Sequence, residues 1–201
     1  MRKYVIALMV VVVCAMAFVS PAQAQTKTEI GIKGGFGFAN LTGDVTGTKS
    51  ALSLGGGGLI RFPLSPQFSI QPELLLILKG TMEKGDDGEK LKLTYIEVPI
   101  LAMYRPPTKG TVRPVFFTGP VLGLLLSAKV GDDDIKESLN GTDFGLVFGA
   151  GVDFETGAKG KIFLEARYTM GISNIAKDSG DDSVKNGVFS LGVSYLLPLG
   201  Q

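Results

Sequence analysis

Six charged residues fall within stretches that otherwise alternate between large apolar and small residues. They are Lys33, Arg61, Glu73, Glu97, Glu165 and Arg167. Carboxylates and bases held close together can form ion pairs or transfer protons, and a guanidinium can bind two carboxylates at once. All six share the side of the alternation that carries the small residues, so one enclosed interior would bring them together. We therefore predict a buried ion-pair network with Arg167 as its hub.

This network has two candidate roles. An unpaired charge in a narrow, poorly hydrated interior is costly, so the six side chains must find one another or trapped water. We expect the removal of Arg167 to leave at least two of Glu73, Glu97 and Glu165 without a partner. The network is either a structural filling, which is the main prediction, or a proton-sensitive gate, because buried carboxylates readily shift their pKa.

Catalytic chemistry has little support in the sequence, because the chain contains no histidine. Lipases, deacylases and proteases generally rely on a histidine as the base or as its orienting partner. No local pattern suggests a Ser-Lys pair or a carboxylate-only site. The glycine run 55–58 lacks the Lys-Ser/Thr pair and the helix of a phosphate-binding loop. We predict that the protein is not an enzyme and has no catalytic residue, cofactor or metal site.

Eight segments with a period of two residues must position the charged side chains. Their ranges are 29–38, 51–62, 68–79, 93–104, 115–127, 143–155, 161–172 and 187–199. In 143–155, for example, Phe144, Leu146 and Phe148 alternate with Gly145, Val147 and Gly149. No segment has a sustained helical period, so the sequence predicts an all-β protein.

The connections between these segments alternate in length. Roughly 12 to 14 residues follow the first, third, fifth and seventh segments, whereas the other connections are shorter. This pattern is typical of an outer-membrane barrel, which has short periplasmic turns, longer extracellular loops and an even number of strands. Three long connections carry acidic clusters, 83–90, 131–137 and 177–182. We interpret these clusters as solvated loop tips, and the weaker alternative is a set of divalent-cation bridges to lipopolysaccharide phosphates.

The apolar face of each segment needs a partner, and lipid fits better than a second protein layer. The opposite face combines Gly, Ser and Thr with charged residues near the strand centres, which suits the narrow interior of a small closed barrel. We predict an eight-stranded antiparallel up-and-down transmembrane β-barrel, closed by pairing the first segment with the eighth. A lipocalin-like soluble barrel, acting as a lipid carrier with its apolar face inside, and a sandwich are the alternatives.

The N-terminus indicates export. Arg2 and Lys3 precede an apolar run of 15 residues, 5–19, and Ala22-Gln23-Ala24 has the small-x-small pattern of a signal-peptidase site. The run is shorter than the roughly 20 residues of a membrane anchor, which is the alternative. We predict a cleavable signal-peptide helix within residues 1–24 and one barrel domain, 25–201. Without Arg2 and Lys3 the chain has 18 basic and 19 acidic residues, so no basic excess suggests nucleic acid.

Several motifs together resemble the PorT-like family of outer-membrane β-barrel proteins from Gram-negative bacteria. They are "GIKGGFGFANLTG", "FSIQPELLLILKG", "LTYIEVPILAMY", "FFTGPVLGLLLS", "DFGLVFGAGVDFE" and "EARYTMGISNI". The likeness covers about residues 29–197 and implies an eight-stranded barrel in the outer membrane of a Gram-negative bacterium, in contact with outer-membrane lipids and lipopolysaccharide. The named member of the family takes part in protein secretion and gliding-related export. The resemblance therefore implies an alternative role as a component or assembly factor of a secretion apparatus.

Two details of the segments relate to barrel assembly. Pro72, Pro99 and Pro120 fall inside segments, as they do in the family motifs, and we expect β-bulges there. The stretch 190–197 resembles the signal read by the barrel-assembly machinery. Its residues are Ser190, Gly192, Tyr195 and Leu197.

The main functional prediction is a small outer-membrane barrel with a plugged polar interior, which has a structural or interaction role and contacts other envelope proteins through its loops.

Overall fold

The computed structural model describes residues 27–43, 48–83, 90–131, 133–156, 160–175 and 184–199. The predicted signal peptide, 1–24, lies outside these residues, as do most of the acidic clusters 83–90 and 177–182. In the described part of the chain, no helix combines the length and the apolar character needed to cross a membrane.

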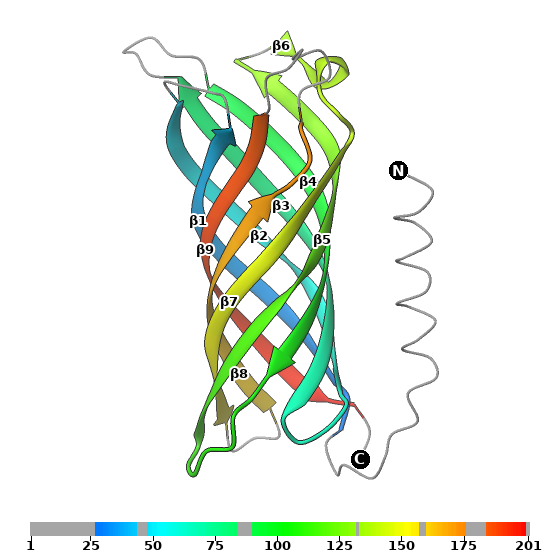
Figure 1. Ribbon diagram of the computed structural model, residues 1–201, viewed down its shortest axis with the longest axis vertical. Helices are drawn as coiled ribbons and strands as arrows, with labels where there is room; N and C mark the ends of the chain where they lie inside the picture. The colour runs from blue at the N-terminus through cyan, green and yellow to red at the C-terminus, as the bar shows by residue number, and fades with distance from the viewer. Residues whose placement is uncertain are drawn as a thin grey trace.

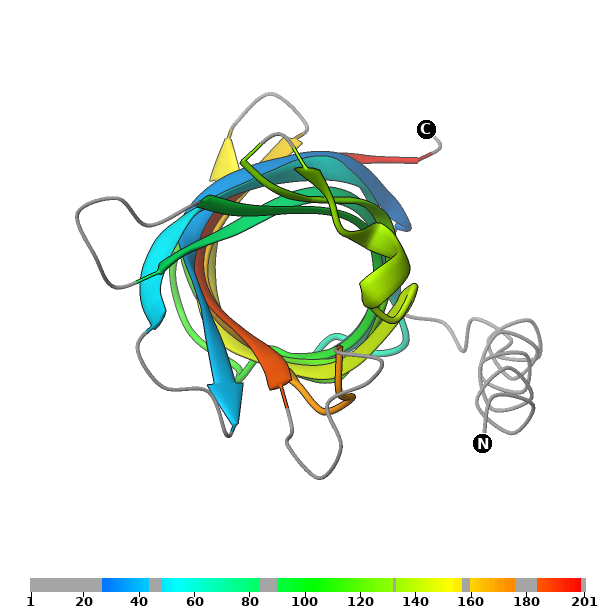
Figure 2. The same ribbon diagram turned by 90° about the horizontal axis from the view of Figure 1, so that it is seen from above.

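Eight long strands form one closed antiparallel barrel (Figures 1 and 2). They are β1 (Glu29–Gly43), β2 (Thr48–Pro63), β3 (Phe68–Glu83), β4 (Lys90–Tyr104), β5 (Val112–Val130), β7 (Thr142–Thr156), β8 (Gly160–Gly171) and β9 (Val184–Pro198). Each pairs with its neighbours along the chain, and β1 pairs with β9 to close the barrel. The short β6 (Asp133–Asp134) pairs with the end of β5, and η1 (Lys136–Ser138) follows it. The predicted eight-stranded up-and-down barrel is confirmed.

Seven of the eight long strands extend further than the sequence pattern indicated, and β8 has the predicted length. The eight strands have 12 to 19 residues, whereas about 9–11 tilted residues cross a membrane. β1 continues to Gly43 and β2 begins at Thr48, so their connection is much shorter than the 12 to 14 residues predicted. The polar ends were missed because backbone pairing continues beyond the apolar stretch, as in Thr42 opposite Lys185.

The barrel has two distinct ends (Figure 1). β1 begins and β9 ends at one of them, which also carries the connections 64–67, 105–111 and 157–159, and we name it the turn end. The loop end carries the other four connections, including β6 and η1. Ile135 and Leu139, next to η1, pack against a buried cluster that contains Leu93, Tyr95 and Leu125. The described part of the β5–β7 connection is therefore a folded part of the loop end.

The prolines do not produce the predicted bulges. Register shifts occur instead at Ser50/Leu54 and at Thr94/Tyr95. Around Pro72 the register between β2 and β3 is unchanged, with Leu59 opposite Glu73 on one side and Phe62 opposite Ile70 on the other. The prediction of bulges at Pro72, Pro99 and Pro120 was wrong, because a proline removes one ladder hydrogen bond without requiring an extra residue.

The two faces of the barrel wall have opposite character. Outward side chains are large, apolar and exposed, as Ile32 (71%) and Leu74 (60%) illustrate. This orientation contradicts the lipocalin-like alternative, which requires the apolar face inside. The interior also contains large apolar side chains, which the sequence did not predict. They are Leu59, Leu101, Met103, Val115, Phe117, Val121, Val147, Phe163 and Leu196.

Candidate functional site

Four charged side chains meet in the middle of the interior, and we name them the central cluster: Lys33, Glu73, Glu165 and Arg167. The Arg167 guanidinium binds Glu73 through two nitrogens, Nη1 to Oε2 at 3.0 Å and Nη2 to Oε1 at 3.1 Å, and its Nε lies 2.7 Å from Glu165 Oε1. Lys33 Nζ lies 2.9 Å from Glu73 Oε1 and 2.8 Å from Glu165 Oε1. Two cations and two anions therefore form a buried, formally neutral group.

Arg167 shares the role of hub with Lys33. Both cations contact both glutamates, so Glu73 and Glu165 would each keep Lys33 as a partner if Arg167 were removed. The expectation that at least two glutamates would lose every partner was therefore wrong. The expectation failed because the register between the strands was unknown, and this register determines which side chains contact one another.

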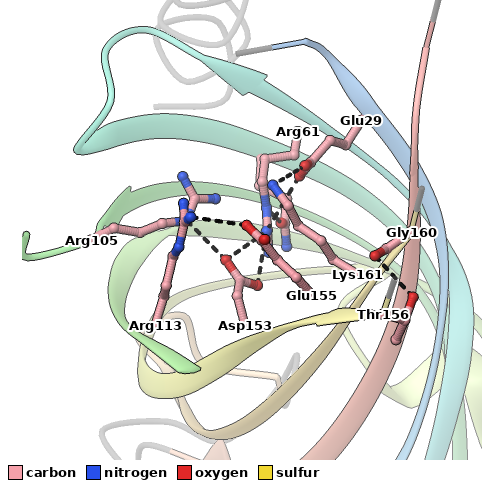
Figure 3. Close-up of polar contacts among 10 residues, drawn as sticks. Glu29, Arg61, Arg105, Arg113, Asp153, Glu155, Thr156, Gly160 and Lys161 are labelled. Carbon is pink, nitrogen blue, oxygen red and sulfur yellow. Dashed lines mark hydrogen bonds and ion pairs between the residues drawn. The ribbon is translucent and has the colours of Figure 1, made fainter. Parts of the chain in front are cut away.

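Arg61 belongs to a second group of charges at the turn end (Figure 3). Its Nη1 lies 3.0 Å from Asp153 Oδ1 and 3.5 Å from Glu29 Oε2. Arg105 Nε donates a hydrogen bond of 2.9 Å to Asp153 Oδ2, and Lys161 pairs with Glu29. We name these five residues the turn-end cluster. Figure 3 shows them converging from several strands.

Arg105 follows β4 and lies in the connection outside the strands. Burial lowers the pKa of its guanidinium below the ordinary value and the nearby charge of Arg61 lowers it further, while Asp153 opposes both effects. An arginine nevertheless stays protonated under physiological conditions. The turn-end cluster therefore has three cations and two anions, a formal excess of one positive charge.

Gln71 connects the central and turn-end clusters. Arg61 Nε donates a hydrogen bond of 2.7 Å to Gln71 Oε1, and Gln71 Nε2 donates one of 2.7 Å to Glu73 Oε1. Gln71 is fully buried, so both bonds lie away from water. A continuous chain of polar contacts therefore extends from the turn end to the middle of the barrel.

Glu97 lies apart from Arg167, in a third group near the loop end. Lys79 Nζ lies 2.6 Å from Glu97 Oε1 and 3.9 Å from Asp143 Oδ2. Asn186 donates a hydrogen bond of 2.6 Å to Asp143 Oδ2. Lys79 also lies over the Tyr95 ring, 4.7 Å from its centroid. We name Lys79, Glu97, Asp143 and Asn186 the loop-end cluster.

Sequence reasoning missed several members of these groups. Glu29, Asp143, Asp153 and Lys161 have inward-facing positions at the ends of their strands. Strand parity was the signal that could have identified them, but the prediction considered only charged residues away from the strand ends. The strands are in fact long enough to enclose them.

Small cavities lie among the interior side chains. A cavity of about 50 Å³ lies between the central and loop-end clusters, with Lys33, Glu165, Lys79 and Glu97 in its lining. Such a volume holds a few water molecules at most. Glu165 Oε2 is buried and finds no hydrogen-bond partner in the described part of the chain, so it is the natural acceptor for such a water. Among the described residues, no group of three or more acidic, His or Cys side chains is arranged to hold a metal ion.

The residues that resemble an assembly signal all lie on β9. Ser190 and Gly192 face the interior, whereas Tyr195 and Leu197 face outward and are 40% and 44% exposed. The outward pair is therefore accessible along the wall near the turn end.

Comparisons with known proteins agree with this architecture. A family model described as "Outer membrane protein beta-barrel domain" matches residues 22–177. Neisserial surface protein A is 17% identical over 82% of this chain and 95% of its own, with a TM-score of 0.54. OprG from Pseudomonas aeruginosa is 15% identical over 87% of this chain and 97% of its own, also with a TM-score of 0.54. At these identities the likeness shows the fold alone. No curated protein matches the chain.

Proposed function

Because the chain belongs to the outer membrane protein β-barrel domain family, we propose that it is a small envelope barrel with a closed interior that acts through its loop end. The observation that carries this proposal is the central cluster, in which Lys33, Glu73, Glu165 and Arg167 occupy the middle of the barrel. A channel for bulk solutes needs open space there. This interior instead contains ion pairs and packed apolar side chains, as expected for an eight-stranded barrel.

The ion pairs hold opposite walls of the barrel together because their members come from different strands. Glu73 lies on β3 and Arg167 on β8, which are four places apart in the ring of eight strands. Separating them would leave charges in a poorly hydrated interior, which costs several kcal/mol per unpaired ion. The cluster therefore opposes widening of the barrel. We propose a structural role for it rather than a gating role, because each cation contacts both anions.

The loop end provides the surface for interaction. Its described part includes η1, whose residues are exposed, and Asn140 and Ile175 link the β5–β7 and β8–β9 connections through a backbone hydrogen bond of 2.8 Å. We propose that this end faces the cell exterior and contacts lipopolysaccharide and other envelope proteins. We also propose that export follows cleavage after Ala24, and that the β9 residues are read by the barrel-assembly machinery. We assign no reaction to the protein, because a histidine-free chain lacks the usual base.

Cysteine labelling in intact cells tests this placement. The only cysteine of the sequence, Cys14, lies in the predicted signal peptide, so a single introduced thiol reports its own position. Glu137→Cys in η1 at the loop end should react with a membrane-impermeant maleimide, whereas Lys109→Cys at the turn end should react only after the membrane is opened. Labelling of Lys109→Cys alone would reverse the proposed orientation. A protein recovered in the aqueous periplasmic fraction would contradict the membrane location.

A further inference from the structure

An apolar groove of about 670 Å³ crosses the outer wall near the turn end. It lies over β9, β1, β2 and β3, which are adjacent in the barrel. Its apolar lining consists mainly of Ile30, Ile32, Ile60, Leu74, Tyr195 and Leu197. The groove belongs to the face that meets the membrane, so the hydrocarbon of the bilayer is continuous with it.

Gly58 lies in the lining of this groove, and the packing of the barrel does not require a glycine there. A Cβ at Gly58 would find the Gly31 carbonyl oxygen 3.9 Å away as its nearest neighbour. Gly58 is also not among the described glycines with positive φ, which are Gly110 and Gly131. At the adjacent Gly57, by contrast, a Cβ would collide with the Leu74 backbone. Close packing of the strands therefore requires a glycine at position 57. At position 58 there is room for a side chain, and its absence keeps the groove open.

The two ends of the barrel differ in charge. Among the described residues, the turn end has six basic and three acidic side chains. The basic ones are Lys27, Arg61, Arg105, Lys109, Arg113 and Lys161, and the acidic ones are Glu29, Asp153 and Glu155. In the sequence, the four stretches that make up the loop end, 40–53, 80–93, 128–143 and 173–186, contain thirteen acidic and eight basic residues, so this end has an acidic excess. The groove therefore opens toward the basic end of the molecule.

We propose that the groove binds one anionic phospholipid of the inner leaflet, with an acyl chain against Gly58 and the phosphate at the turn end near Lys27. This assignment rests on the proposed orientation of the barrel. Lys27 is exposed and immediately precedes Thr28, whose carbonyl oxygen accepts a hydrogen bond from the Leu199 amide below the groove. A thin, flexible acyl chain can follow a concave groove, whereas the convex wall of a second barrel would touch only its rim. The excess of basic side chains favours a negative headgroup.

Native mass spectrometry of the folded barrel released from vesicles tests the proposal. The vesicles contain equal amounts of phosphatidylglycerol and phosphatidylcholine with identical acyl chains. The wild type should retain one phosphatidylglycerol per monomer, with a preference over phosphatidylcholine of about fivefold, the effect of roughly one basic residue near a charged surface. Gly58→Leu should abolish retention and Gly58→Ala should weaken it, since the open space at Gly58 allows both variants to fold.

Two matched controls locate the site. Ala150→Leu adds the same kind of side chain to the outer face of β7, on the opposite side of the barrel, and should leave retention unchanged. Lys27→Gln should remove the headgroup preference, whereas Lys109→Gln in the β4–β5 connection should keep it. Equal retention by Gly58→Leu and Ala150→Leu would overturn the proposal. A dimer that Gly58→Leu dissociates would assign the groove to a second copy instead, and an inverted barrel would show in the labelling experiment.

Discussion

Arg167 and Glu73 bind each other across the full width of the barrel, because their strands β8 and β3 are four places apart in a ring of eight. Arg61 on β2 and Asp153 on β7 have the same relationship at the turn end. Gln71 joins the two pairs. Ion pairs therefore connect opposite strands at two heights along the barrel, in its middle and at its turn end.

The first prediction concerns the energetic weight of the central cluster. Arg167→Leu should lower the free energy of unfolding by about 3 kcal/mol, because it leaves one buried glutamate charge uncompensated. Arg113→Leu is the matched control, since Arg113 pairs with Glu155 at 3.0 Å but both side chains are nearly half exposed. That change should cost about 1 kcal/mol or less. Urea unfolding in vesicles measures both, and equal losses would contradict the role of the buried pair.

A second prediction follows from the charge balance of the same cluster. Replacing Arg167 and Glu73 together by Leu and Gln leaves Lys33 paired with Glu165, which is again neutral. The double variant should therefore be more stable than Arg167→Leu alone. A double-mutant cycle should give a coupling energy of about 1–3 kcal/mol. Additive effects of the two changes would show that the pair is not coupled.

The third prediction concerns the link between clusters. Gln71→Leu removes a partner from both Arg61 and Glu73 in the buried interior, so it should cost about 1–3 kcal/mol of unfolding free energy. Gln67→Leu, at an exposed position of the β2–β3 connection, should change stability by about 0.5 kcal/mol or less. If the two changes had the same small effect, the polar chain would not contribute to stability.

The fourth prediction concerns the lipid-facing wall. Leu76 faces outward in the middle of β3, opposite Gly56 and Ile96, and Leu76→Arg should cost about 2–4 kcal/mol. Val112→Arg, at the exposed start of β5 near the turn end, should cost about 1 kcal/mol or less. Folding yield into vesicles and urea unfolding report the difference. A harmless Leu76→Arg would show that this face does not meet lipid.

Substitutions on the inward face are poor controls for this experiment. Ser53 is buried, and a Cβ at Gly171 would collide with the Asn186 backbone. Ser53→Arg and Gly171→Ser should therefore destabilise the barrel as well. The interior is more crowded than a lining of small residues and a few ion pairs would make it.

Strand parity was sufficient to predict the fold and the inward direction of the six charged residues. It placed Glu97 and Arg167 on the same interior face but could not predict their separation, because partners depend on register and on height along the barrel. The apolar side chains inside β5, such as Phe117, were missed because both faces of that segment are apolar. The outer groove was missed because the sequence alone does not distinguish two kinds of glycine. At some positions a side chain would collide with a neighbouring strand, as at Gly57, whereas at others there is room for one, as at Gly58.

Conductance across a planar bilayer tests the closed interior most directly. The wild-type barrel should show no large, stable conductance, because the central cluster and the packed apolar side chains occupy the middle of the interior. Refolded protein should be confirmed by its heat-modifiable migration on gels before each recording. A large, steady conductance from the wild type would contradict the account.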